Sequence, residues 1–174
     1  MLLLRGASVH DPDPIGTLDV LIGGEKILAI GPRLDVPAAL APVIDLGGCV
    51  LAPGLVDVHV HLTGGGGEGG AETRVPPVLA SALAGNGVTT AVGLLGTDGT
   101  TRSIRELLAC ARALDALGLT ALCYTGSYEV PPPTLTGSVR GDLVHVDRIV
   151  AVGEPSETTG RRHPRRVRDP RTPP

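Results

Sequence analysis

The sequence predicts an α/β protein in which a small all-β unit precedes a run of alternating strands and helices. Residues 2–52 consist of short apolar runs separated by glycine-rich turns, with few helix signals. From Pro53 onward, apolar strand segments alternate with segments that carry helix start and stop signals, which is the pattern of βαβ units and a parallel sheet. Aromatic residues are almost absent, with two Tyr and no Phe or Trp, so the core must consist of Leu, Val, Ile and Ala.

The all-β unit is expected to contain short strands joined by tight turns. Gly23-Gly24 suits a hairpin turn, and Gly31-Pro32 ends the strand that follows it. Gly47-Gly48 marks another turn of this kind. The expected strands are residues 2–4, 19–22, 26–30 and 43–46.

The second region begins with a strand at residues 54–61, where Val alternates with polar residues. Proline at the start and Gly85-Asn86-Gly87 after the end predict a helix over residues 76–84. Ser103 and Glu106 form a possible capping box for a helix over residues 103–117, with Gly118 as its stop. The remaining elements are expected to be strands at residues 88–95 and 119–124 and a short helix at residues 142–150.

His59 and His61 are the strongest chemical signal. Residues i and i+2 of a strand point to the same face, so both imidazoles would project together and could bind one divalent ion. Such a pair also occurs on surfaces and in cores, so its context matters. Asp57 lies two residues before His59, and we interpret it as a structural acid of the strand and not as a general base.

The residues around this pair resemble a known family. Pro53-Gly54 leads into Asp-x-His-x-His, which resembles the opening of the amidohydrolase superfamily. The following TGGGGEGG run has no lysine after it, which excludes a P-loop. Together with residues 73–76, this run resembles the loop of isoaspartyl (β-aspartyl) dipeptidases. Further matches to that family follow in order at residues 87–90, 92–98, 124–128 and 136–139.

The resemblance implies a fold and a reaction. Residues 1–52 would be the N-terminal portion of a small β-sandwich domain, and residues 53–154 the first three or so βα units of a TIM-like (β/α)8 barrel. Such a barrel takes about 250 residues, so this one would be incomplete. The implied activity is zinc-dependent hydrolysis of the isopeptide bond of β-aspartyl dipeptides, with a binuclear zinc centre in the intact family.

The resemblance also implies roles for single residues. His59 and His61 would bind the more buried metal, and Glu154 would bridge the two ions. Glu68 would bind the free α-amino group of the substrate, with Thr97 beside that group, and Tyr128 would polarise the scissile carbonyl. Taken singly, Glu68 and Glu154 could be surface acids, Thr97 a turn residue and Tyr128 a packing residue.

The resemblance stops after Glu154, where the family would continue towards Asp-His-Arg-Ser. The codons of residues 155–160, read one nucleotide out of phase, can spell Ala-Ile-Arg-Asp-His-Arg. We therefore expect residues 155–174 to be a disordered, out-of-frame tail, with a natural basic tail as the alternative. A chain truncated in this way would lack later metal ligands and would be inactive alone.

Two other functions stay open. Dihydroorotases and hydantoinases share Asp-x-His-x-His but are not expected to carry the GGGGE loop, and a pseudogene remnant would catalyse nothing. No apolar stretch approaches the ~20 residues of a membrane span, and the three scattered cysteines favour a reducing compartment. We expect a cytoplasmic protein that binds a small dipeptide and neither membrane nor nucleic acid, and that forms a homo-oligomer if full length.

Overall fold

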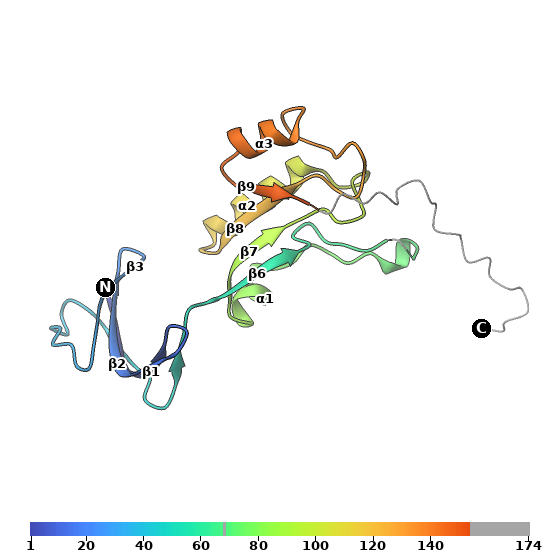
Figure 1. Cartoon of the computed structure of the whole chain (residues 1–174). Coiled ribbons are helices and arrows are strands. Elements are labelled where there is room, and N and C mark those ends of the chain that lie inside the picture. Colours follow the sequence, from blue (N-terminus) through green and yellow to red (C-terminus); the bar gives the residue numbers. More distant parts are fainter. Residues whose placement is uncertain (68, 154–174) are drawn as a thin grey trace, which may run out of the picture. The chain divides into compact units, whose positions relative to one another are not determined.

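The computed structural model describes residues 1–67 and 69–153. The chain divides into two compact units, the first spanning Met1–Gly54 and the second beginning at Leu55 (Figure 1). The prediction that residues 155–174 are a disordered, out-of-frame tail concerns residues outside the described part of the chain.

The first unit is a five-stranded sheet. β1 forms antiparallel pairs with β2, and β2 with β3, while β4 and β5 both pair with β1 in parallel. The expected strand at residues 2–4 is the start of a longer one, because pairing with β2 continues as far as His10. The strands are β1 (Leu2–His10), β2 (Pro14–Gly23), β3 (Lys26–Gly31), β4 (Val43–Asp45) and β5 (Val50–Leu51).

Asp19 of β2 holds this unit together at one end. Its carboxylate accepts hydrogen bonds from the backbone N–H groups of Gly6 (3.0 Å) and Leu34 (3.1 Å), and Arg5 lies 3.5 Å away. The hydrogen bond from Leu34 outweighs burial and keeps the pKa of Asp19 below its usual value. The buried cluster of the sheet is small and consists of Ala7, Val9 and Val20.

Over residues 55–67 and 69–153, the second unit contains three consecutive βα units and a fourth strand. Its strands lie in the order β6-β7-β8-β9 and every pair is parallel, as Figure 1 shows. This confirms the α/β class and the partial barrel expected from the sequence, since a (β/α)8 barrel has eight such strands. The elements are β6 (Leu55–Val60), a 3-10 helix (Ala71–Thr73), α1 (Ala80–Gly85), β7 (Val88–Gly93), α2 (Ile104–Ala116), β8 (Thr120–Thr125), α3 (Val139–His145) and β9 (Ile149–Val152).

Helix α2 begins and ends where its sequence predicts. The Ser103 side chain accepts a hydrogen bond from the Glu106 N–H, which satisfies one of the open donors at the helix start. Gly118 follows the last turn with φ of 90°, a conformation that favours glycine. The apolar face of the helix packs against β8 and its neighbours through Ile104, Leu107, Ala111 and Leu114.

The short helix expected at residues 142–150 is present, but its expected bounds are wrong. Helix α3 covers Val139–His145, Val146 already has extended backbone angles, and Ile149–Val152 forms β9. The apolar run at the end pairs with β8 instead of continuing the helix. Helix α1 also starts four residues later than predicted, because Leu79 keeps an extended backbone.

Among the residues that the structure describes, strand β6 lies at the edge of its sheet and is paired with β7 alone. Its apolar residues are exposed, with Leu55, Val56 and Val58 at 60%, 62% and 57%. The alternation of Val with polar residues predicts one buried face, yet both faces of β6 are open. Within residues 1–67 and 69–153, none of the helices has the length and apolar character needed to cross a membrane.

Candidate active site

The two histidines lie together at the carboxyl end of β6. The ring centroids of His59 and His61 are 5.7 Å apart, with ring planes at 68°. The Asp57 carboxylate accepts a hydrogen bond from the His59 backbone N–H at 3.0 Å, which fits the structural role expected of this acid. The pair thus has the proximity that a shared metal ion requires.

Two glycines make room for the His61 ring. A Cβ atom on Gly65 would lie 3.1 Å from Cγ of His61, and one on Gly96 would collide with the far side of the ring. Gly96 also has φ of 64°, which disfavours other residues. One glycine of the glycine-rich loop and one of the loop after β7 therefore pack directly against the His61 ring.

Three loops meet at the same edge of the sheet, because parallel strands have their carboxyl ends side by side. The loop after β6 contains His61, the loop after β7 contains Thr97, and the loop after β8 contains Tyr128. The Tyr128 N–H donates to the Gly96 carbonyl at 3.3 Å, which joins the second and third loops. Thr97 is exposed and Tyr128 is half-buried.

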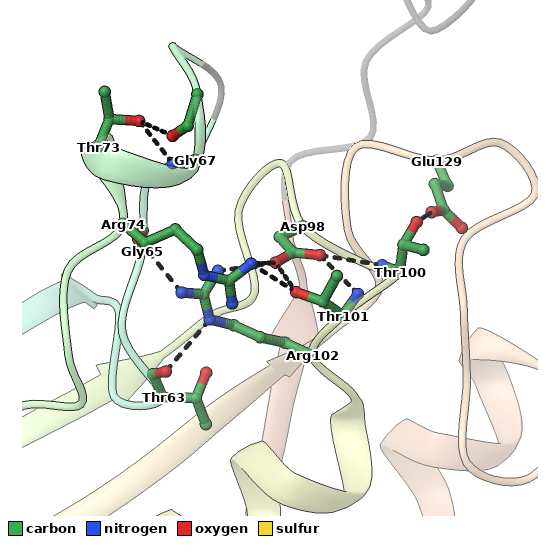
Figure 2. A network of polar contacts seen from close by, with 11 residues as sticks. Thr63, Gly65, Gly67, Thr73, Arg74, Asp98, Thr100, Thr101, Arg102 and Glu129 are labelled. Carbon is green, nitrogen blue, oxygen red and sulfur yellow. Dashed lines mark hydrogen bonds and ion pairs between the residues drawn. The ribbon is translucent and has the colours of Figure 1, made fainter.

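A buried ionic network connects the first two loops (Figure 2). Arg102 donates to the carbonyl oxygens of Thr63 and Gly65, both at 3.2 Å, and to the Asp98 carboxylate at 2.9 Å. Burial opposes ionisation of Asp98, but hydrogen bonds from Thr101 and the charge of Arg102 outweigh it, so its pKa lies below the usual value. Asp98 is therefore a carboxylate at neutral pH.

A second buried carboxylate shapes the loop after β8. Asp142 of α3 is fully buried and accepts hydrogen bonds from the backbone N–H groups of Leu135 (3.0 Å) and Thr136 (2.8 Å) and from the Thr125 hydroxyl. Burial opposes ionisation here too, but these hydrogen bonds outweigh it and lower the pKa of Asp142. The carboxylate fixes both ends of the segment that contains Tyr128.

The described residues bring together two of the three side chains expected to bind metal, His59 and His61. Among residues 1–67 and 69–153, no three side chains of the metal-binding types are grouped closely enough to hold an ion. Glu68 and Glu154, the expected substrate-binding and bridging residues, lie outside the described residues. The structure therefore brings together His59 and His61, and positions Thr97 and Tyr128 on neighbouring loops.

Comparison with known proteins agrees with this arrangement. Residues 42–99 match the amidohydrolase family. The structure resembles the β-aspartyl dipeptidase of Fervidobacterium islandicum AW-1, solved in complex with β-Asp-Leu, with 46% identity, a TM-score of 0.81, and coverage of 88% of this chain and 40% of that one. The chain is thus similar to amidohydrolases over residues 42–99 and to a β-aspartyl dipeptidase over most of its length. The resemblance to β-aspartyl dipeptidases predicted from the sequence is confirmed.

The chain is also similar to a dihydroorotase and to a dihydropyrimidinase. The dihydroorotase of Streptococcus thermophilus is 37% identical over 118 residues, which is 64% of this chain and 26% of that protein. The dihydropyrimidinase of Brevibacillus agri is 24% identical with a TM-score of 0.57, which shows a shared fold. The chain thus spans about a quarter of the first curated relatives and 40% of the dipeptidase.

The sequence does not predict the residues that organise these loops. Asp98 lies within the match at residues 92–98 but the sequence indicates no role for it, and it indicates none for Arg102 or Asp142. One signal was available: Asp98-Gly99 is a turn sequence, and Asp98 precedes Arg102 by four residues. Nothing in the sequence indicates that Arg102 reaches carbonyl groups nearly forty positions earlier.

Proposed function

We propose that this chain contributes to a metal-dependent hydrolase that cleaves the isopeptide bond of β-aspartyl dipeptides. The observation that carries the proposal is the convergence of the His59–His61 pair with the loops of Thr97 and Tyr128 at one edge of the sheet. The likeness to a dipeptidase solved with β-Asp-Leu supports this choice of substrate.

The donor chemistry fits zinc. Neutral imidazoles are preferred zinc ligands, and a catalytic zinc takes three protein ligands. His59 and His61 would supply two, and Glu154 is the proposed carboxylate that bridges to a second ion. When bound, zinc polarises a carbonyl oxygen and lowers the pKa of coordinated water.

The substrate contacts follow from charge and hydrogen-bonding capacity. Glu68 would pair with the α-ammonium group of the β-aspartyl residue, and the Thr97 hydroxyl would accept a further hydrogen from that group. The Tyr128 hydroxyl would donate a hydrogen bond to the scissile carbonyl, where negative charge develops during hydrolysis. A homo-oligomer of the full-length protein and a cytoplasmic location stay predictions.

A dihydroorotase-like or hydantoinase-like function is the second candidate, favoured by the similarity to dihydroorotases. We rank it lower because the likeness to β-aspartyl dipeptidase covers more of the chain at higher identity. A non-catalytic remnant is the third. We expect the chain alone to turn over no dipeptide, because the described residues bring only two metal ligands together.

Calorimetric titration separates these candidates. We expect the chain to bind zinc, His59→Ala and His61→Ala to weaken that binding at least tenfold, and His145→Ala, on the exposed end of α3, to leave it unchanged. The zinc-loaded chain should bind β-Asp-Leu and neither α-Asp-Leu nor dihydroorotate. Binding of dihydroorotate alone would favour the second candidate. If neither His59→Ala nor His61→Ala weakens zinc binding, the proposed metal site is wrong.

A further inference from the structure

Arg102 occupies an unusual position for an arginine outside the proposed chemistry. It directly precedes Ser103, the cap of α2, and is 6% exposed. Its Nε, Nη1 and Nη2 atoms each donate a hydrogen bond to a different acceptor. A buried guanidinium is costly unless its donors are paired, so the loss of these hydrogen bonds would strongly destabilise the protein.

Two of the three acceptors belong to the glycine-rich loop. The Thr63 and Gly65 carbonyls lie directly after His61, in a stretch where Gly64 and Gly66 have positive φ values. Glycines provide no side chains that could hold this backbone in place. The loop gains its fixed path from such carbonyl contacts and from the Val75 N–H, which donates to the Gly65 carbonyl at 2.9 Å.

The third acceptor, Asp98, fixes the turn that contains Thr97. One carboxylate oxygen accepts from the N–H groups of Thr100 (3.2 Å) and Thr101 (2.7 Å). The other accepts from Arg102. The turn and the glycine-rich loop are therefore joined through one buried side chain, as Figure 2 shows.

Arg74 makes a second, outer link between the same two segments. Its Nη1 atom donates to Asp98 at 3.3 Å and to the Thr101 hydroxyl at 2.8 Å, and its side chain is 42% exposed. An open pocket of about 260 Å³ lies between the loops, lined by Gly66, Gly67, Arg74, Thr97, Asp98 and Thr101. Arg102 thus supports this pocket from inside the protein.

We propose that Arg102 is a positioning residue that couples the glycine-rich loop to the Thr97 turn and so sets the width of the pocket between them. The inference rests on the proposed function only in assigning the amino end of a β-aspartyl dipeptide to this pocket. Lysine cannot replace it fully, because an ammonium group on a flexible stem does not match three acceptors arranged around a planar fork.

Hydrogen exchange on the whole chain tests the coupling. In Arg102→Met, peptides covering residues 63–75 and 96–101 should both exchange at least about tenfold faster, while β8 and the middle of α2 stay within about twofold of the parent. Arg102→Lys should give a smaller increase in the same two segments. Arg105→Met, an exposed arginine three residues later, is the matched control and should change neither loop.

Unchanged exchange in either loop of Arg102→Met would overturn the proposal, as would a uniform increase across the unit, which indicates a general structural role. If Arg102→Met does not fold, Asp98→Asn gives the same decision. It keeps the arginine but weakens its link to the turn, so exchange should rise more at residues 96–101 than at residues 63–67.

Ligand binding distinguishes this inference from the proposed function. Arg102→Met should weaken β-Asp-Leu binding at least tenfold, because Arg102 holds Thr63 and Gly65 on one side of the pocket and Asp98 on the other. If the parent chain binds no β-Asp-Leu, the proposed function fails, and the exchange experiment still decides the role of Arg102. If the parent binds β-Asp-Leu and Arg102→Met binds it equally well, Arg102 does not set the width of the pocket.

Discussion

The imidazole of His61 lies against the α-carbon of Gly96, a residue of the neighbouring loop with φ of 64°. The contact leaves no space for a side chain at position 96. The position of the His61 ring, a proposed metal ligand, therefore depends on Gly96 being a glycine. It also explains why the loop after β7 follows the end of β6 so closely, with the Leu94 N–H donating to the Val60 carbonyl at 3.1 Å.

We expect Gly96→Ala to displace the His61 ring and weaken zinc binding at least about tenfold, with a stability loss of about 1–3 kcal/mol from the left-handed backbone. Gly118→Ala is the matched control, because Gly118 has φ of 90° and open space around its α-carbon. It should lose stability and keep its zinc affinity. Equal zinc affinities in the two variants, measured by chelator competition, would contradict the packing argument.

Asp142 predicts a specific response to acid. Its folded-state pKa lies below the ordinary 3.8, so the carboxylate contributes stability that is present above about pH 4 and lost as pH falls through the folded value. We expect Asp142→Asn to lower the free energy of unfolding by about 3 kcal/mol at pH 7, because it replaces an acceptor of several buried hydrogen bonds. The variant should also show a flatter loss of stability between about pH 5 and pH 2.

Urea denaturation at several pH values would measure both effects. Asp147→Asn, an exposed aspartate just after α3, is the control and should change the unfolding free energy by less than about 0.5 kcal/mol. An Asp142→Asn variant with the parent's pH dependence would show that another group is responsible for acid sensitivity.

The cysteines should differ sharply in reactivity. Cys123 of β8 is fully buried, and burial together with Cys110 raises its pKa to about 12, while Cys49 is exposed. At pH 8 the Cys123 thiolate is scarce, so we expect alkylation at least about a thousandfold slower than at Cys49. Peptide mass spectrometry after timed labelling measures both rates. Comparable rates in the native protein would show that β8 opens more readily than its burial suggests.

The elements with strong local signals could be predicted from the sequence. Ser103 and Gly118 set the limits of α2 because capping and left-handed glycine act within a few residues. The spacing of His59 and His61 was equally informative, since a strand places alternate residues together. These features depend on geometry that a short segment determines by itself.

Features that depend on distant partners could not be predicted in this way. Ile149–Val152 reads as the continuation of a helix, and only pairing with β8 makes it a strand. Arg102 is an ordinary charged residue in the sequence, and its acceptors at Thr63 and Gly65 become neighbours only when two loops meet. Asp142 is completely buried because Leu135 and Thr136 fold back onto it from the preceding loop, together with Thr125 of β8, and no sequence pattern indicates this.

The short sequence distance between His59 and His61 has a thermodynamic consequence. Two imidazoles separated by one residue remain near each other after the chain unfolds, so zinc retains affinity for the denatured ensemble. Ligands stabilise a fold only through the difference between their affinities for the two states. Saturating zinc should therefore raise the melting temperature by less than its native-state dissociation constant implies. In His59→Ala, which lacks one of the two imidazoles, this difference between the observed and the implied rise should not appear.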